Sequence, residues 1–166
     1  MPVVTVIDEV DQSLFHLLDE ADWTLPGFQK PLITFESPKD IQENPSEENK
    51  LCIYLYKILL DTFLRNNVSS SIYLELYYLI VPYSKKKSDE KLILGTAIQI
   101  FANHPVLSES LLFGSLGKTD QAIHLLFHPL TVDELTNIWS TFQTTGYHLS
   151  MAYLVRPVPV EIASLS

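Results

Sequence analysis

Apolar residues recur every three or four positions in three segments of the chain, a spacing typical of helices that bury one face. The first segment runs from about Thr5 to Glu20, and Thr5-Val-Ile-Asp8 resembles a capping box in which Asp replaces the usual Glu. The last segment follows a complete capping box, Thr131-Val-Asp-Glu134. The apolar positions of these two helices are Ile7, Val10, Leu14, Leu17, Leu135, Ile138, Trp139 and Phe142.

The middle helix is expected from Leu92 to Ala102, and separate signals mark its two ends. Ser88 is the expected N-cap, and two acidic residues follow it where the helix dipole favours negative charge. His104 stands before Pro105, a position that is disfavoured in helical geometry, so the helix should end there.

Alternating apolar positions and many β-branched or aromatic residues predict five strands. Their expected ranges are 32–35, 51–60, 71–83, 121–127 and 147–155. The third is the longest and is apolar on both faces except at Glu75, as expected for a central strand between two layers. In the second, alternation groups Ile53, Leu55 and Lys57 on one face, and a helix from Ile58 to Leu64 is an alternative for its last part.

The order α-β-β-β-α-β-α-β predicts an α/β (α+β) fold with a single mixed or antiparallel sheet of about five strands and helices packed on it. At 166 residues the chain fits one domain, expected over residues 1–155. Residues 38–50 are rich in Pro, Glu, Asn and Ser, which predicts a flexible loop. Residues 156–166 are expected to form an extended C-terminal tail, with a disordered end as the alternative.

Composition excludes several classes of protein. The net charge of -9 argues against a nucleic-acid binder, because phosphate affinity comes mainly from Lys and Arg. No apolar run approaches the ~18 residues of a membrane span, and the start lacks a basic segment followed by an apolar one, so we expect neither a span nor a secretory signal. The single cysteine, Cys52, forms no internal disulfide and fits a reducing cytoplasm.

No set of residues predicts catalysis. Gly114-Ser-Leu-Gly-Lys-Thr119 resembles the end of a phosphate-binding loop, but Leu112 stands where that motif needs glycine, and a strand rather than a helix should follow. His124 and His128 lie in an expected strand, where ~13 Å would separate them, too far to share a metal. We therefore predict no catalytic, cofactor-binding or metal-binding residues.

Tyrosines gather in two consecutive expected strands. Tyrosine is common at protein contacts, although it also packs well within sheets, so core packing is the favoured interpretation and an interface the alternative. The six residues are Tyr54, Tyr56, Tyr73, Tyr77, Tyr78 and Tyr83.

Several segments, in their order and spacing, resemble a known family. They are Ile7-Asp-Glu-Val-Asp-Gln-Ser-Leu14, Ile53-Tyr-Leu-Tyr-Lys57, Leu74-Glu-Leu-Tyr-Tyr-Leu79, Leu94-Gly-Thr-Ala-Ile-Gln99 with His104-Pro-Val-Leu107, Ile138-Trp-Ser140 and Leu149-Ser-Met-Ala-Tyr153. Together they are similar to the N-terminal domain of the terminator (cap) proteins of phage-tail-like contractile injection systems, of the anti-feeding-prophage and virulence-cassette type.

The resemblance implies a tail-terminator fold and a non-enzymatic, structural role. It implies a hexameric ring on the end of the inner tube and contractile sheath farthest from the baseplate, where the ring ends polymerisation and joins tube to sheath. The implied partners are other copies of the chain, inner-tube and sheath proteins and other cap paralogues. We expect assembly in the cytoplasm, within a particle that is released from the cell.

The expected contact surface combines the only basic cluster with the C-terminal tail. The tail alternates apolar residues with prolines, which suits docking of one side onto a neighbouring sheet. The expected contact residues are Lys85, Lys86, Lys87, Arg156, Pro157, Val158, Val160 and Ile162. Two rival functions remain: an assembly chaperone or adaptor for tube or sheath subunits, and an enzyme whose cleft would hold Glu75 beside a histidine.

Overall fold

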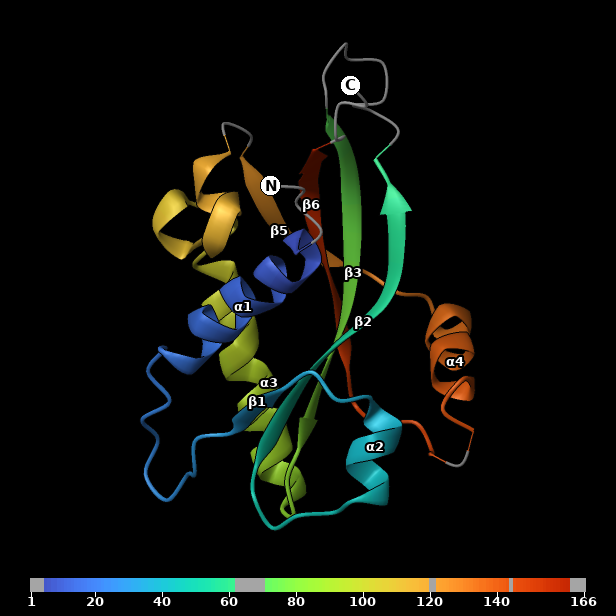
Figure 1. Cartoon of the computed structure of the whole chain (residues 1–166). Coiled ribbons are helices and arrows are strands. Elements are labelled where there is room, and N and C mark those ends of the chain that lie inside the picture. The colour runs from blue at the N-terminus through green and yellow to red at the C-terminus, as the bar shows by residue number, and fades with distance from the viewer. Residues whose placement is uncertain (1–4, 62–70, 120–121, 144, 162–166) are drawn as a thin grey trace.

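The computed structural model describes residues 5–61, 71–119, 122–143 and 145–161. Helices and strands alternate along the chain, largely as the sequence predicts (Figure 1). The elements are α1 (Val6–Asp19), β1 (Leu32–Thr34), α2 (Pro38–Glu43), β2 (Lys50–Leu60), β3 (Ser71–Tyr83), α3 (Lys87–Ala102), β4 (Val106–Leu107), η2 (Glu109–Leu111), η3 (Gly114–Lys118), β5 (Ile123–His128), α4 (Val132–Ser140) and β6 (Met151–Glu161).

One mixed sheet forms the centre of the fold, in the strand order β1-β2-β3-β6-β5-β4. β1 pairs with β2 in parallel and every other neighbouring pair is antiparallel. The predicted α/β class with a single sheet is confirmed. The sheet has six strands rather than about five, because the two-residue strand β4 lies in a segment that has no pattern typical of a strand.

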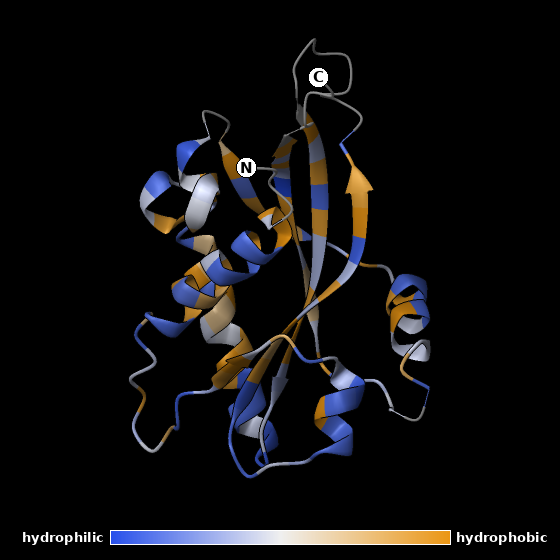
Figure 2. Cartoon of the chain, in the orientation of Figure 1, coloured by the Kyte–Doolittle hydropathy of each residue, from blue (hydrophilic) through white to orange (hydrophobic). Residues whose placement is uncertain are grey.

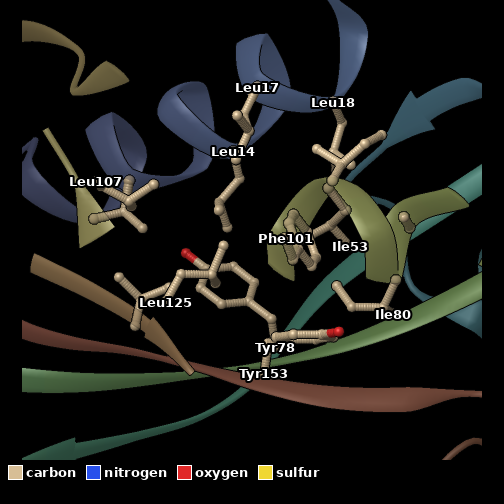
Figure 3. Close-up of a cluster of buried hydrophobic side chains, with 14 of the residues drawn as sticks. Leu14, Leu17, Leu18, Ile53, Tyr78, Ile80, Phe101, Leu107, Leu125 and Tyr153 are labelled. Carbon is tan, nitrogen blue, oxygen red and sulfur yellow. The ribbon is translucent and has the colours of Figure 1, made fainter. Parts of the chain in front are cut away.

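α1 and α3 cover one face of the sheet, which we call the inner face (Figure 1). Apolar residues of both helices meet those of the central strands in the main core, where Leu14 and Leu18 of α1 lie near Phe101 of α3 (Figure 3). The rings of Phe101 and Tyr153 contact each other edge to face at 4.7 Å. The amphipathic stripes predicted from the sequence therefore do form the core.

α2 and α4 lie on the opposite, outer face and cover the part of it near the end of β3 at Tyr83, which is the lower end in Figure 1. A second, smaller core forms beneath them. Trp139 of α4 is buried there and donates a hydrogen bond from Nε1 to the Oγ of Ser150 (3.1 Å). The buried members of this core are Ile41, Cys52, Leu79, Val81, Trp139 and Phe142.

A β-bulge at Tyr56 changes which face the later side chains of β2 occupy. Leu55 pairs with Tyr78, but the next pairing is Lys57 with Tyr77, so Tyr56 is an extra residue. Two neighbouring residues then share one face, and the alternation resumes with the opposite phase. The predicted grouping of Lys57 with Leu55 is therefore wrong.

Lys57 lies instead on the outer face, with its Nζ 4.2 Å from the centroid of the Tyr77 ring. Ile58 pairs with the core residue Leu76 and so takes the inner face.

A second bulge lies in β6, where the step from Val155 to Val158 matches only the step from Leu76 to Leu74 in β3. The extra residue keeps both valines on the inner face, in the main core. The predicted extended tail from residue 156 is therefore wrong for residues 156–161, which continue β6. Pro157 and Pro159 are tolerated because β5 pairs with β6 only as far as Arg156, and beyond it no described strand pairs with this side of β6.

The predicted flexible loop over residues 38–50 is also wrong for residues 38–43. Pro38–Glu43 forms the short helix α2, and Ser37 caps it by accepting a hydrogen bond from the N–H of Asp40 (3.1 Å). Pro38 takes the first helical position, where its missing N–H costs nothing. One apolar residue, Ile41, is enough to anchor the helix in the second core.

The helix ends agree with prediction in part. Thr131 caps α4, accepting from the N–H of Glu134 at 3.1 Å, as predicted. α3 begins at Lys87, so its N-cap is Lys86 rather than Ser88. Thr5 is the N-cap of α1 but makes no side-chain capping bond. The predicted end of α3 is confirmed, since the helix stops at Ala102 and the His104 ring Nδ1 lies 2.8 Å from the carbonyl oxygen of Ile100.

Candidate interaction surfaces

The predicted contact residues fall at opposite ends of the sheet and do not form one surface. Lys85, Lys86 and Lys87 follow the lower end of β3, whereas Val158–Glu161 pair with its upper end at Ser71–Leu74. Val158 has no exposed surface and lies in the protein's own core, and Ile162 lies outside the described residues.

The lysines make local ion pairs. Lys85 Nζ lies 2.5 Å from a carboxylate oxygen of Glu47, and Lys87 Nζ lies 3.1 Å from one of Glu90. The first pair is exposed, which makes it worth little to stability. The second fixes the first turn of α3.

Arg156 belongs to a charged network on the outer face. Its Nε donates to Asp61 Oδ2 at 2.9 Å and lies 3.5 Å from Glu75 Oε1, while Nη2 also binds Asp61. The Asp61 side chain is fully buried. A buried carboxylate needs a partner charge, and here Arg156 of β6 reaches across β3 to supply it. The network ties three strands together.

Arg156 is thus the charged partner of Glu75, which the sequence alone could not identify. The second carboxylate oxygen of Glu75 accepts a hydrogen bond from the Tyr77 hydroxyl (2.8 Å). Burial first, and then that hydrogen bond to Glu75, raise the pKa of Tyr77 to about 12. His128 packs edge to face on the Tyr77 ring at 4.9 Å. The acid and the histidine lie on either side of a tyrosine and do not contact each other as an acid–base pair would.

A hollow of about 520 Å³ opens at the lower end, between α2, the start of α3 and the segment before β6. At its wall, His148 Nε2 lies 2.5 Å from Glu90 Oε2 and 2.7 Å from the carbonyl oxygen of Pro82. The His148 ring also stacks on Tyr83 at 4.5 Å. Because both acceptors meet the same nitrogen, that nitrogen carries a proton and holds the three segments together.

The Glu90–His148 pair is the acid and histidine that sequence analysis missed, since 58 positions separate them. The Glu90 carboxylate binds His148 and Lys87, and the His148 ring nitrogen also binds the backbone carbonyl of Pro82. Such contacts are typical of a structural role. Within the described ranges, no three metal-binding side chains come together. Nor does any described helix have the length and apolar character of a membrane-crossing segment.

Apolar side chains remain exposed at the upper end of the sheet. Ile58, Leu59 and Leu60 keep 44%, 43% and 56% of their surface accessible, and Ile72 of β3 lies nearby at 41%. This end extends past α1 and past α4, and Figure 2 shows the last part of β2 as hydrophobic. Toward the opposite edge of the sheet, Leu126 and Phe127 of β5 are also exposed. Exposed apolar surface of this extent commonly marks a contact with another protein.

A further apolar groove of about 460 Å³ runs along α4, lined by Val132, Leu135, Trp139 and Tyr147 among others. The surface therefore has apolar regions suited to contacts with other proteins. Among the described residues, no group of side chains is arranged for catalysis.

Comparison with known proteins agrees with a surface that binds other proteins. Residues 9–164 match the sequence profile of the family described as the Pvc16 N-terminal domain. The chain belongs to this family. The resemblance to the N-terminal domain of terminator (cap) proteins of contractile injection systems, expected from the order of the segments, is confirmed by this match and by two solved structures. The search of curated proteins found no match.

Two solved structures share the fold of this Pvc16 N-terminal domain. The sheath/tube terminator of an extracellular contractile injection system (PVC), in its extended state, superposes with a TM-score of 0.67 at 19% identity over 93% of this chain. The tube-terminating cap of the anti-feeding prophage gives 0.62 at 18% identity over 99%. The chain spans 56% of the length of each of these proteins.

Proposed function

We propose that this chain is a structural subunit of the cap that terminates a contractile injection system. In this proposal, copies of the chain form a hexameric ring on the distal end of the inner tube and sheath. The ring ends polymerisation and joins tube to sheath. The observation that carries the proposal is the match over 93% of the chain to a protein described as a sheath/tube terminator.

Surface chemistry supports a role in binding proteins rather than in catalysis. Exposed apolar side chains flank both sides of the sheet, while the acid–histidine pair at the lower end is fully engaged in structural contacts. The net charge of -9 disfavours a nucleic-acid partner. The proposed partners are other copies of the chain, the inner-tube and sheath proteins and other cap paralogues, assembled in the cytoplasm into a particle that is then released.

Deletion of the gene, followed by electron microscopy of the particles, tests this function. A terminator sets where growth stops, so particles without it should show uncontrolled or unstable tube and sheath lengths. Complementation with the intact gene should restore a narrow length distribution. An unchanged length distribution in the deletion strain would contradict the proposal.

The alternative is an assembly chaperone or adaptor for tube or sheath subunits. Quantitative mass spectrometry of purified particles separates the two functions. A cap subunit remains at one hexamer per particle, whereas a chaperone is lost during purification.

A further inference from the structure

The central sheet has an open edge on each side. β1 pairs with β2 only as far as Cys52, on the edge of β2 that faces away from β3. Among the described residues, no strand pairs with Ile53–Leu60 along that edge. β4 covers β5 only at Ile123 and His124, and one further bond runs from the N–H of Leu125 to the carbonyl of Pro105 (2.9 Å). Open edges with exposed apolar residues are unusual unless another strand pairs with them.

The two open edges lie at the same level of the sheet. Following the pairing from β2 through β3 and β6 to β5 joins residues into rows. One row runs Leu55, Tyr78, Tyr153, Phe127, and the next runs Lys57, Tyr77, Leu154, Leu126. Each open segment of β5 therefore has an open segment of β2 directly across the sheet.

The two edges also run in opposite directions, because three antiparallel pairings separate β2 from β5. When copies are related by rotation about an axis along the strands, β2 of one copy meets β5 of the next in antiparallel orientation. Because the open segments share a level, this contact needs no shift along the axis. A head-to-tail contact without a shift closes into a ring, whereas a shift would give a helical filament.

Backbone groups at both edges point toward this contact. The N–H of Leu125 points away from β6, since it donates to Pro105, and alternation then directs the N–H and C=O of Phe127 the same way. On β2, the N–H of Asp61 donates to Tyr73 of β3 (2.8 Å), so Ile58 and Leu60 direct their groups outward. Both edges thus direct backbone donors and acceptors outward beside exposed apolar side chains, and no described strand pairs with those of Phe127 or Ile58.

From these relationships we infer that the open edge of β2, around Leu55–Ile58, pairs with the open edge of β5, Leu126–His128, in a second copy of the chain. The resulting sheet continues from one subunit to the next around the ring. This inference rests on the proposed ring and adds the surfaces that build it.

Cysteine cross-linking tests the pairing. Lys57 and Leu126 share a row and both lie on the outer face, so in the proposed contact their Cα atoms face each other across adjacent strands. Within one copy, three strand spacings of ~4.8 Å separate them, beyond the ~7 Å limit for a disulfide. A disulfide in the double variant K57C/L126C must therefore join two copies. The native Cys52 has no exposed surface and should not react.

The variant is assembled under reducing conditions and then oxidised, both in purified particles and as concentrated free protein. We expect loss of the monomer band on a non-reducing gel and a ladder of linked species that ends at the hexamer. Each single variant should give no product beyond a dimer. The matched control K57C/L92C, which places the second cysteine on an exposed position of α3, should give no ladder.

A second pair, L55C/F127C, samples the neighbouring row on the inner face and replaces the first if K57C/L126C does not fold. The edge pairing would be overturned if both variants fold but neither gives a ladder, in particles that contain the chain and in free protein. That result would leave the cap function intact. Particles that lack the chain would contradict the proposed function instead, and the free-protein arm would then decide the edge pairing alone.

Discussion

The guanidinium of Arg156 binds the buried carboxylate of Asp61 across an intervening strand, with Nε 2.9 Å from Oδ2. Ninety-five positions separate the two residues in sequence. Their contact fixes the middle of β6 to the residue that follows β2, next to the exposed apolar residues Ile58–Leu60.

Substitution R156A should destabilise the fold strongly. It removes one partner of a buried ion pair, a change that typically costs about 3 kcal/mol or more. Urea denaturation measures the loss. The double variant D61L/R156M removes both charges and should recover most of the stability, and an R156A protein as stable as the wild type would show that the pair contributes little.

Truncation after Arg156 should unfold the upper half of the sheet. It removes Val158, whose burial alone is worth about 2 kcal/mol, together with the pairing between the end of β6 and the start of β3. Truncation after Glu161 is the matched control and should leave the melting temperature close to that of the full chain, because it keeps all of β6. Equal melting temperatures for both truncations would contradict the assignment of residues 156–161 to the sheet.

Asp11 and Tyr78 offer a test of pH dependence. The Tyr78 hydroxyl donates to Asp11 Oδ1 (2.7 Å), but burial outweighs this bond and raises the pKa of Asp11 above 3.8. An acid with a raised pKa in the folded state is a stability cost above that pKa, and the cost disappears as the pH falls below 3.8. D11N should therefore be more stable than the wild type at neutral pH, because its amide oxygen still accepts from Tyr78.

This advantage of D11N should vanish near pH 3, which denaturation curves at the two pH values would show. Y78F is the contrasting variant. It leaves Asp11 without its donor and should lose about 2 kcal/mol at neutral pH. A D11N variant less stable than the wild type at neutral pH would contradict this account.

Tyr56 and Tyr77 are two of five tyrosines whose raised pKa values alkaline titration should reveal. Burial, as the largest cause, raises the pKa of Tyr56 and of Tyr77 to about 12. Unfolded tyrosine ionises near pH 10. The stability that these two residues contribute is complete below pH 10 and is lost as the pH rises from 10 to about 12. Ultraviolet absorbance of the phenolate, with Y77F as the control, would measure this, and simple ionisation of Tyr77 near pH 10 in the folded protein would contradict it.

The long elements could be predicted because their apolar periodicity is strong. α1, α4 and β3 each show one pattern over their whole length, and local packing follows it. The predictions failed where a single inserted residue decides the outcome. The bulge at Tyr56 is invisible to alternation, and so is the extra residue in β6 that returns Val158 to the core. α2 carried its own signal in Ser37 and Pro38, but with one buried apolar anchor it had no periodicity.

The contacts between charged groups could not be predicted for a different reason. Glu90 meets His148 and Asp61 meets Arg156 only because sheet order brings distant segments together. A local pattern in the sequence contains no information about that order. A charged residue inside an apolar strand, such as Glu75, is the one signal that could have directed attention to the Arg156 network.

The two bulges have a consequence for anyone aligning remote members of this family. Each adds one residue without lengthening the sheet, so a homologue can lose or gain a position at Tyr56 or beside Pro157 and keep the same three-dimensional frame. Where a relative lacks one of these bulges, a gap at that point keeps inward-facing residues aligned with inward-facing residues. An ungapped alignment through the same strands would instead match core positions of one protein with solvent positions of the other.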